Sequence, residues 1–105
     1  MTAFDLYSLY DVQTPSGRRL MTSFYVNLTE RLEELEEGLT GGDSEKVANV
    51  LHKLTNAESF GFPRITELAR LIEVAYPRRD EQVIESCVKE LIDEKDSLSL
   101  VLSAH

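Results

Sequence analysis

The sequence has few sulfur or imidazole groups that could bind a metal or form a disulfide: one cysteine, Cys87, and two histidines among 105 residues. A single thiol cannot form an internal disulfide or a cysteine-based zinc site, which favours a reducing compartment. No stretch approaches the roughly 20 apolar residues of a membrane span, and the N-terminus lacks the basic region of a secretory signal. We therefore expect a cytoplasmic protein with no membrane partner, no metal site and no cofactor.

Positive charge is also scarce, because 11 lysines and arginines face 19 aspartates and glutamates, for a formal net charge of −8. An acidic surface repels phosphate backbones, so nucleic acid is a poor candidate for a partner. The chain is 42% hydrophobic and 29% charged, an ordinary balance for a globular protein. Its length predicts one domain spanning residues 1–105.

Glycine and proline, which interrupt helices, gather in a few short segments around residues 15–17, 41–44, 61–63 and 77. Between these segments the apolar residues recur at spacings of three and four, which is typical of amphipathic helices. The first predicted helix spans about 17–39, and its apolar stripe consists of Leu20, Phe24, Leu28, Leu32, Leu35 and Leu39. Glycines at 41–42 should end this helix, and Asp43 or Ser44 can cap the next one.

Three more helices follow. The second should end near 59–61, the third should start at Pro63 and stop before Pro77, and the fourth should span about 80–103. The inward residues of the second helix are predicted to be Val47, Val50, Leu51, Leu54 and Ala57. Those of the third are Ile65, Leu68, Ala69, Leu71 or Ile72, and Ala75. Those of the fourth are Val83, Ile84, Cys87, Val88, Leu91, Ile92, Leu98 and Val101 or Leu102. The sequence therefore predicts an all-α fold, an antiparallel up-down four-helix bundle. A short extra N-terminal helix over residues 4–10 should cover one end.

His52 is the candidate for chemistry, since the other histidine, His105, is the last residue of the chain. At about 100° per residue, His52 points roughly 140° away from the middle of its helix's apolar arc, toward solvent. The residues predicted to surround it are short and uncharged: Ala48, Asn49, Thr55, Asn56 and Ser59. Such a ring leaves the imidazole open to a bulky partner. On position alone, however, a lone exposed histidine on a helix usually has no function.

A neutral imidazole is a nucleophile near pH 7, because its ordinary pKa is about 6.5. Phosphoryl transfer depends mainly on positioning and on charge neutralisation. The sequence offers no carboxylate cluster for Mg²⁺ beside His52 and no glycine-rich phosphate loop. A partner would have to supply both, so the protein would act as a phosphoryl carrier without a complete catalytic centre of its own.

The stretch from Leu51 to Ile65, LHKLTNAESFGFPRI, resembles the signature of the histidine-phosphotransfer (HPt) domains of bacterial two-component phosphorelays. The helix before it, with its Gly41-Gly42-Asp43 turn, and the helix after it resemble the elements that flank this signature. The resemblance implies that His52 is the phospho-accepting histidine. It also implies that the partners are response-regulator receiver domains or hybrid histidine kinases. The expected docking patch consists of Ala48, Asn49, Lys53, Thr55, Asn56 and Ser59, with Arg64 at its edge.

Three features depart from the family pattern. Thr55 stands where the family usually has lysine, Asn56 stands where it usually has glycine, and Gly61 comes one residue early. They leave open a second hypothesis, in which the chain is a non-transferring helical adaptor that binds a receiver or kinase domain. A helical subunit of a larger assembly is a third alternative. Under the first hypothesis the protein is expected to be a monomer.

Overall fold

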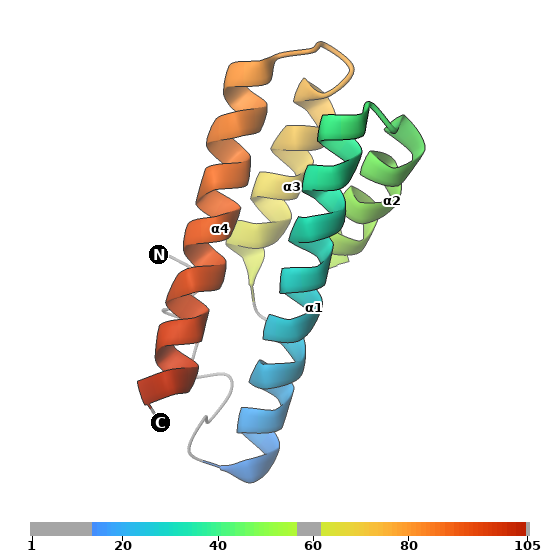
Figure 1. The fold of residues 1–105 in the computed structure, drawn as a ribbon. Helices are drawn as coiled ribbons and strands as arrows, with labels where there is room; N and C mark the ends of the chain where they lie inside the picture. The colour runs from blue at the N-terminus through green and yellow to red at the C-terminus, as the bar shows by residue number, and fades with distance from the viewer. Residues whose placement is uncertain (1–13, 57–61, 105) are drawn as a thin grey trace.

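The computed structural model describes residues 14–56 and 62–104, and these form four α-helices and no strand (Figure 1). The helices are α1 (Pro15–Gly41), α2 (Ser44–Leu54), α3 (Pro63–Ala75) and α4 (Glu81–Ala104). Helix α1 packs against α2 and α4, and α3 packs against the same two helices, as in a four-helix bundle. The predicted all-α fold is confirmed, whereas the expected helix at residues 4–10 lies outside the described residues. No helix among those described is long and apolar enough to cross a membrane.

The helices differ in length, with 27 residues in α1 and 24 in α4 against 11 in α2 and 13 in α3. The molecule is consequently elongated, measuring 43 × 23 × 21 Å. Figure 1 shows the long helices α1 and α4 continuing at one end beyond α2 and α3. The four-helix part of the bundle lies at the other end, and it carries all of α2.

The turn between α1 and α2 follows the sequence prediction. Gly42 takes the left-handed conformation, with φ of 66°, and its amide donates to the carbonyl of Gly38. Asp43 then caps α2, since its carboxylate accepts from the amide of Lys46 at 3.1 Å. A glycine in the left-handed region followed at once by an N-cap reverses the chain within two residues, and α2 packs directly against α1.

Close contact between α1 and α2 depends on Gly38. A β-carbon built at this buried position would lie 2.9 Å from Cγ2 of Val47, closer than two carbon atoms can approach. Gly41, one turn later in the same helix, has no atom within 4 Å of the corresponding position. Gly38 is therefore required by packing between the two helices and not by backbone conformation.

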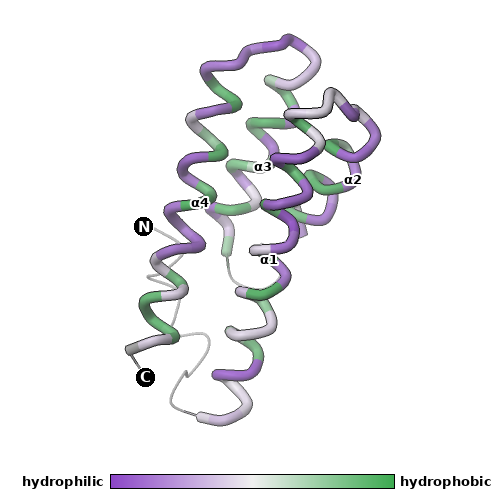
Figure 2. The backbone as a smooth tube through the Cα atoms, viewed as in Figure 1, coloured by the Kyte–Doolittle hydropathy of each residue, from purple (hydrophilic) through white to green (hydrophobic). Residues whose placement is uncertain are grey.

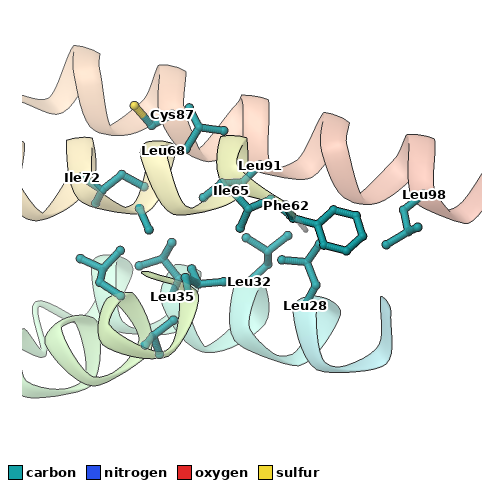
Figure 3. Packing of buried hydrophobic residues seen from close by; sticks show 14 of the residues in the cluster. Leu28, Leu32, Leu35, Phe62, Ile65, Leu68, Ile72, Cys87, Leu91 and Leu98 are labelled. Carbon is teal, nitrogen blue, oxygen red and sulfur yellow. The ribbon is translucent and has the colours of Figure 1, made fainter. Parts of the chain in front are cut away.

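Each helix turns one apolar side toward the others. Figure 2 shows hydrophobic and hydrophilic residues alternating along the helices, as one-sided burial requires. Figure 3 shows the buried side chains from the four helices meeting between them. The cluster consists of Met21, Leu28, Leu32, Leu35, Val47, Val50, Leu51, Leu54, Phe62, Ile65, Leu68, Ala69, Ile72, Cys87, Leu91, Leu98 and Leu102. Phe62 closes it beside α1, where its ring stacks on that of Phe24 with centroids 4.1 Å apart.

The prediction that Leu20 and Val83 belong to the core is wrong, and the geometric reason is the same for both. Leu20 is 56% exposed, and Val83 is 36% exposed. Each lies eight residues before a buried leucine, Leu28 or Leu91, and eight residues at 100° per residue place it about 80° from that leucine. The residue seven positions before the leucine falls only about 20° away. This explains why Met21 is buried in place of Leu20.

The sequence left two pairs of neighbouring residues as alternatives for the inward position, and the structure shows which member of each pair is buried. Ile72 is fully buried while Leu71 is exposed, and Leu102 is buried more deeply than Val101. The prediction that Cys87 is a core thiol is confirmed. Burial raises the pKa of this thiol, and the nearby carboxylate of Glu90 adds to the effect. Cys87 is therefore a packing residue in its protonated form at neutral pH.

Candidate functional site

His52 lies in the last turn of α2 and is exposed, as predicted. The same helix buries Val47, Val50, Leu51 and Leu54 almost completely on its other side. Because these buried residues hold α2 against the core, they fix the direction of His52 without touching its imidazole. The packing of α2 therefore presents the imidazole ring to solvent from a rigid helix.

The residues of the predicted docking patch on α2 and in the turn after it are all at least partly exposed. Ala48, Asn49, Lys53 and Asn56 are exposed, and Thr55 is partly exposed. Ser59, the remaining residue predicted to lie beside His52, is outside the described residues. Apart from Lys53, the side chains that the structure describes on this face are short and uncharged. We use the name His52 face for His52 together with Ala48, Asn49, Lys53, Thr55 and Asn56.

The end of α2 is held by two threonine hydroxyls. Thr55 donates its hydroxyl to the carbonyl of His52 at 2.7 Å, and its amide bonds back to Leu51 and Lys53. Thr66 of α3, which is 1% exposed, donates its hydroxyl to the carbonyl of Thr55 at 3.2 Å. The hydroxyl of Thr66 thus ties the turn after His52 to the neighbouring helix.

These bonds also correct the predicted end of the second helix. The α-helix was expected to continue to about 59–61, but it ends at Leu54, and Thr55 and Asn56 form a tighter 3₁₀ turn. At this turn the carbonyls of His52 and Thr55 accept from threonine hydroxyls, so side chains satisfy acceptors that amides would satisfy in a continuing α-helix. His52 is consequently two residues from the end of its α-helix.

A groove of about 400 Å³ runs along the α1 side of the His52 face. Lys53 of α2 and Asn56 of the turn after it lie on one wall, and Leu20, Phe24 and Asn27 of α1 lie among the residues of the other. The sequence reasoning did not find this groove. The available signal was Leu20, an apolar residue about 80° off the core stripe of α1, which could have been recognised as a surface residue.

The geometry on α2 agrees with the comparison with protein families. The family model of the Hpt domain matches residues 19–100, which is more than half of the chain and includes His52. The chain belongs to the Hpt domain family. Such domains carry out histidine phosphotransfer in phosphorelays and interact with receiver domains and kinases of two-component systems. No match was found among curated proteins or among solved structures.

The position three residues after the histidine differs from the usual Hpt pattern. Where the family usually has lysine, this chain has Thr55, and its hydroxyl is bonded to the carbonyl of His52. Thr55 therefore offers no cation to a phosphoryl group on the imidazole. Lys53, exposed on the α1 side of the His52 face, is the nearest cation in sequence, but it lies about 100° around the helix from His52.

Arg64, predicted at the edge of the Hpt docking patch, is engaged within the bundle. Its guanidinium bonds to the carboxylate of Glu90 on α4 and to that of Glu67 at 3.0 Å one turn along α3. The hydrogen bond that Arg64 donates to Glu90 is the main reason that the pKa of Arg64 is raised. Arg64 thus links α3 to α4, while its predicted contact with a partner stays a prediction.

The described residues contain no group of three or more histidine, cysteine or acidic side chains arranged to hold a metal ion. The one lysine in the first turns of α2, Lys46, is already paired. Lys46 bonds to Glu37 at 2.8 Å, and this hydrogen bond raises the pKa of the lysine. The His52 face itself therefore carries one chemical group suited to phosphoryl transfer, the imidazole.

Proposed function

We propose that this protein carries a phosphoryl group on His52 between the aspartates of receiver domains in a two-component phosphorelay, as a cytoplasmic monomer. The observation that carries the proposal is the setting of His52. It is an exposed imidazole on a rigid helix, among short side chains, in a chain that belongs to the Hpt family.

In the transfer, a neutral imidazole nitrogen attacks the phosphorus of an aspartyl phosphate. A phosphorus–nitrogen bond forms, the phosphorus–oxygen bond to the carboxylate breaks, and the aspartate leaves with the electron pair as a carboxylate. The phosphoramidate can then pass the group to another carboxylate by the reverse sequence. The protein contributes the nucleophile and its orientation, and the receiver domain contributes Mg²⁺ and positive charge.

The docking surface for the receiver is the His52 face together with the groove on its α1 side. Ala48 and Asn49 lie one turn before His52, and Asn56 lies one turn after it. Short side chains here let a second protein approach the ring, while the groove offers apolar contact through Leu20 and Phe24. Arg64, at the start of α3, and Ser59, which lies outside the described residues, are the other predicted members of this surface.

A non-transferring adaptor is the second candidate, and the bond from Thr55 to the carbonyl of His52 favours it. With that hydroxyl turned to the backbone and no lysine in its place, a phosphoryl group on His52 would lack a neighbouring cation from this position. Such a protein would still bind receiver or kinase domains through the His52 face.

The test is transfer from a panel of phosphorylated receiver domains with Mg²⁺ present, followed by measurement of acid-labile, base-stable label on the protein. Wild type should accept label and His52→Gln should accept none. His105→Gln, which changes the other histidine of the sequence, is the matched control and should behave like wild type. The thermal midpoint of His52→Gln should stay close to that of wild type, since an exposed side chain contributes little packing.

Three outcomes separate the alternatives. Label that disappears only in His52→Gln supports transfer. Receiver binding without label, unaffected by His52→Ala, supports the adaptor. Label that persists in His52→Gln contradicts the assignment of the site.

A further inference from the structure

A second groove lies between α1 and α4, at the end of the bundle that contains the turns between α1 and α2 and between α3 and α4. It has a volume of about 910 Å³ and is lined only by residues of the described part of the chain. Figure 1 shows the upper turns of α4 and α1 on either side, with α3 visible between them. Its apolar side chains are Leu39, Tyr76, Ile84, Val88 and Ile92.

These apolar side chains pack against the core and yet remain partly exposed. Ile84, Val88 and Ile92 are spaced four residues apart on α4, so they form a strip about 12 Å long at 1.5 Å per residue. A strip two helical turns in length, between two helices, matches the apolar anchors that an amphipathic helix presents at positions i, i+3 or i+4, and i+7.

The charges at the edges of the groove indicate what kind of helix it fits. Glu36 of α1 and Glu81 and Glu85 of α4 line it, against two cations, Arg79 and Lys89. The three glutamates are exposed, and none of them belongs to a salt bridge in the described structure. Carboxylates bordering an apolar strip favour a partner with basic residues beside its apolar face.

A second copy of the chain is a poorer occupant. In a symmetric dimer the same surface meets itself, so the three glutamates of each copy would face only two cations, Arg79 and Lys89, together with three further glutamates. The net charge of −8 on each chain adds to this repulsion.

The groove is also separate from the His52 face. The only residues it shares with the start of α2 and the turn before it are Gly42 and Ser44. His52 lies eight residues beyond Ser44, about 12 Å further along the helix. No residue of the His52 face lines the groove, so both surfaces can be occupied together.

We propose that the groove between α1 and α4 binds a basic amphipathic helix of a protein partner while the His52 face remains free. A partner bound in this groove would keep the protein attached to that partner without blocking phosphoryl transfer at the His52 face. The inference does not rest on the transfer reaction, because groove binding can be measured without any phosphoryl donor.

The probe is a synthetic peptide of about 15 residues with leucines at helical spacing and lysines on the opposite face. The control peptide has the same amino acids in an order that leaves no apolar helical face. Binding is measured on the full chain by titration and by the shifts of backbone amide NMR signals. The probe should shift signals of Leu39, Ile84 and Val88 and leave those around His52 unchanged, and phosphoryl acceptance should be the same with the probe bound.

Matched charge reversals separate the groove from general attraction to an acidic protein. Glu81→Lys combined with Glu85→Lys should weaken probe binding about tenfold, as two lost favourable pairs imply. Glu30→Lys combined with Glu33→Lys makes the same change in net charge on the exposed face of α1, outside the groove, and should have a much smaller effect.

Several results would overturn the proposal. They are an equal loss in both double variants, equal binding of the control peptide, and shifts centred on the His52 face. A dimer in sedimentation that dissociates when Ile84 is changed to lysine would also overturn it, because it would assign the groove to a second copy.

Discussion

The outer faces of α1 and α2 are both exposed to solvent, but they differ in the kind of side chain that they carry. The exposed positions of α1 include Glu30, Glu33, Glu36 and Glu37, whereas those around His52 are Ala48, Asn49 and Lys53 of α2 and Asn56 of the turn that follows it. Two neighbouring helices in one acidic protein thus present one strongly charged surface and one short, mostly uncharged surface.

The difference teaches that exposure alone does not identify a functional surface. A row of glutamates is well solvated and repels a phosphorylated partner, since both carry negative charge. Short uncharged side chains hold water less strongly and leave room for a partner's backbone. The face of α2 is unusual for a surface in this protein, and the histidine lies within it.

The two sides of α2 can be compared through Leu51, the buried neighbour of His52 in the sequence, which is 2% exposed. Leu51→Ala should lower the free energy of unfolding by about 2–5 kcal/mol, because it removes apolar contacts and leaves a cavity. Chemical denaturation measures the loss. His52→Gln, next in the chain, is the matched control and should change stability by less than about 0.5 kcal/mol.

Placing acids on α2 tests the contrast between the two faces directly. Ala48→Glu combined with Asn56→Glu should slow phosphoryl acceptance roughly thirtyfold, about 2 kcal/mol, because each carboxylate adds bulk and repels the incoming phosphoryl group. Transfer rates from a phosphorylated receiver measure the effect. The converse change on α1, Glu30→Ala with Glu33→Ala, should leave the rate unaltered, and an equal slowing by both pairs would contradict the account.

The contact between the two helices is tested at Gly38. Gly38→Ala should destabilise the fold by about 1–2 kcal/mol, since its β-carbon collides with Val47. Gly41→Ala faces open space in the same helix and should be neutral or slightly stabilising. Thermal unfolding of the pair distinguishes crowding from helix propensity, and equal midpoints would show that the close approach is not required.

The smallest expected effect concerns the hydroxyl of Thr66. Thr66→Val keeps the shape of the side chain but removes the donor to the carbonyl of Thr55, at a cost of about 1 kcal/mol. Hydrogen exchange should quicken at the amide of Thr55, near the end of α2, more than at amides in the middle of α3. Unchanged exchange at the end of α2 would show that this bond does not hold the turn.

Much of the fold could be predicted from the sequence because local signals agreed with packing. Glycine at 42 and Asp43 fixed one helix boundary, and the apolar spacing in α2 gave the outward direction of His52. The errors at Leu20 and Val83 arose because a spacing of four residues, taken twice in succession, drifts about 80° around the helix.

The rest depends on contacts between helices that spacing does not contain. The early end of α2 involves a hydroxyl on α3, and the engagement of Arg64 involves Glu90 on α4. Both grooves depend on how α1 is set against α2 and α4, which no single helix pattern describes.

The central claim, that His52 receives the phosphoryl group, is tested most directly by locating the group on the chain. Cleavage after Lys46 and Lys53 releases the peptide of residues 47–53, VANVLHK, in which His52 is the only side chain expected to accept a phosphoryl group from a receiver domain. After incubation with a phosphorylated receiver, mass spectrometry at neutral pH should find one added phosphoryl group on this peptide, lost on mild acid treatment. An unmodified peptide beside a phosphorylated chain would contradict the account.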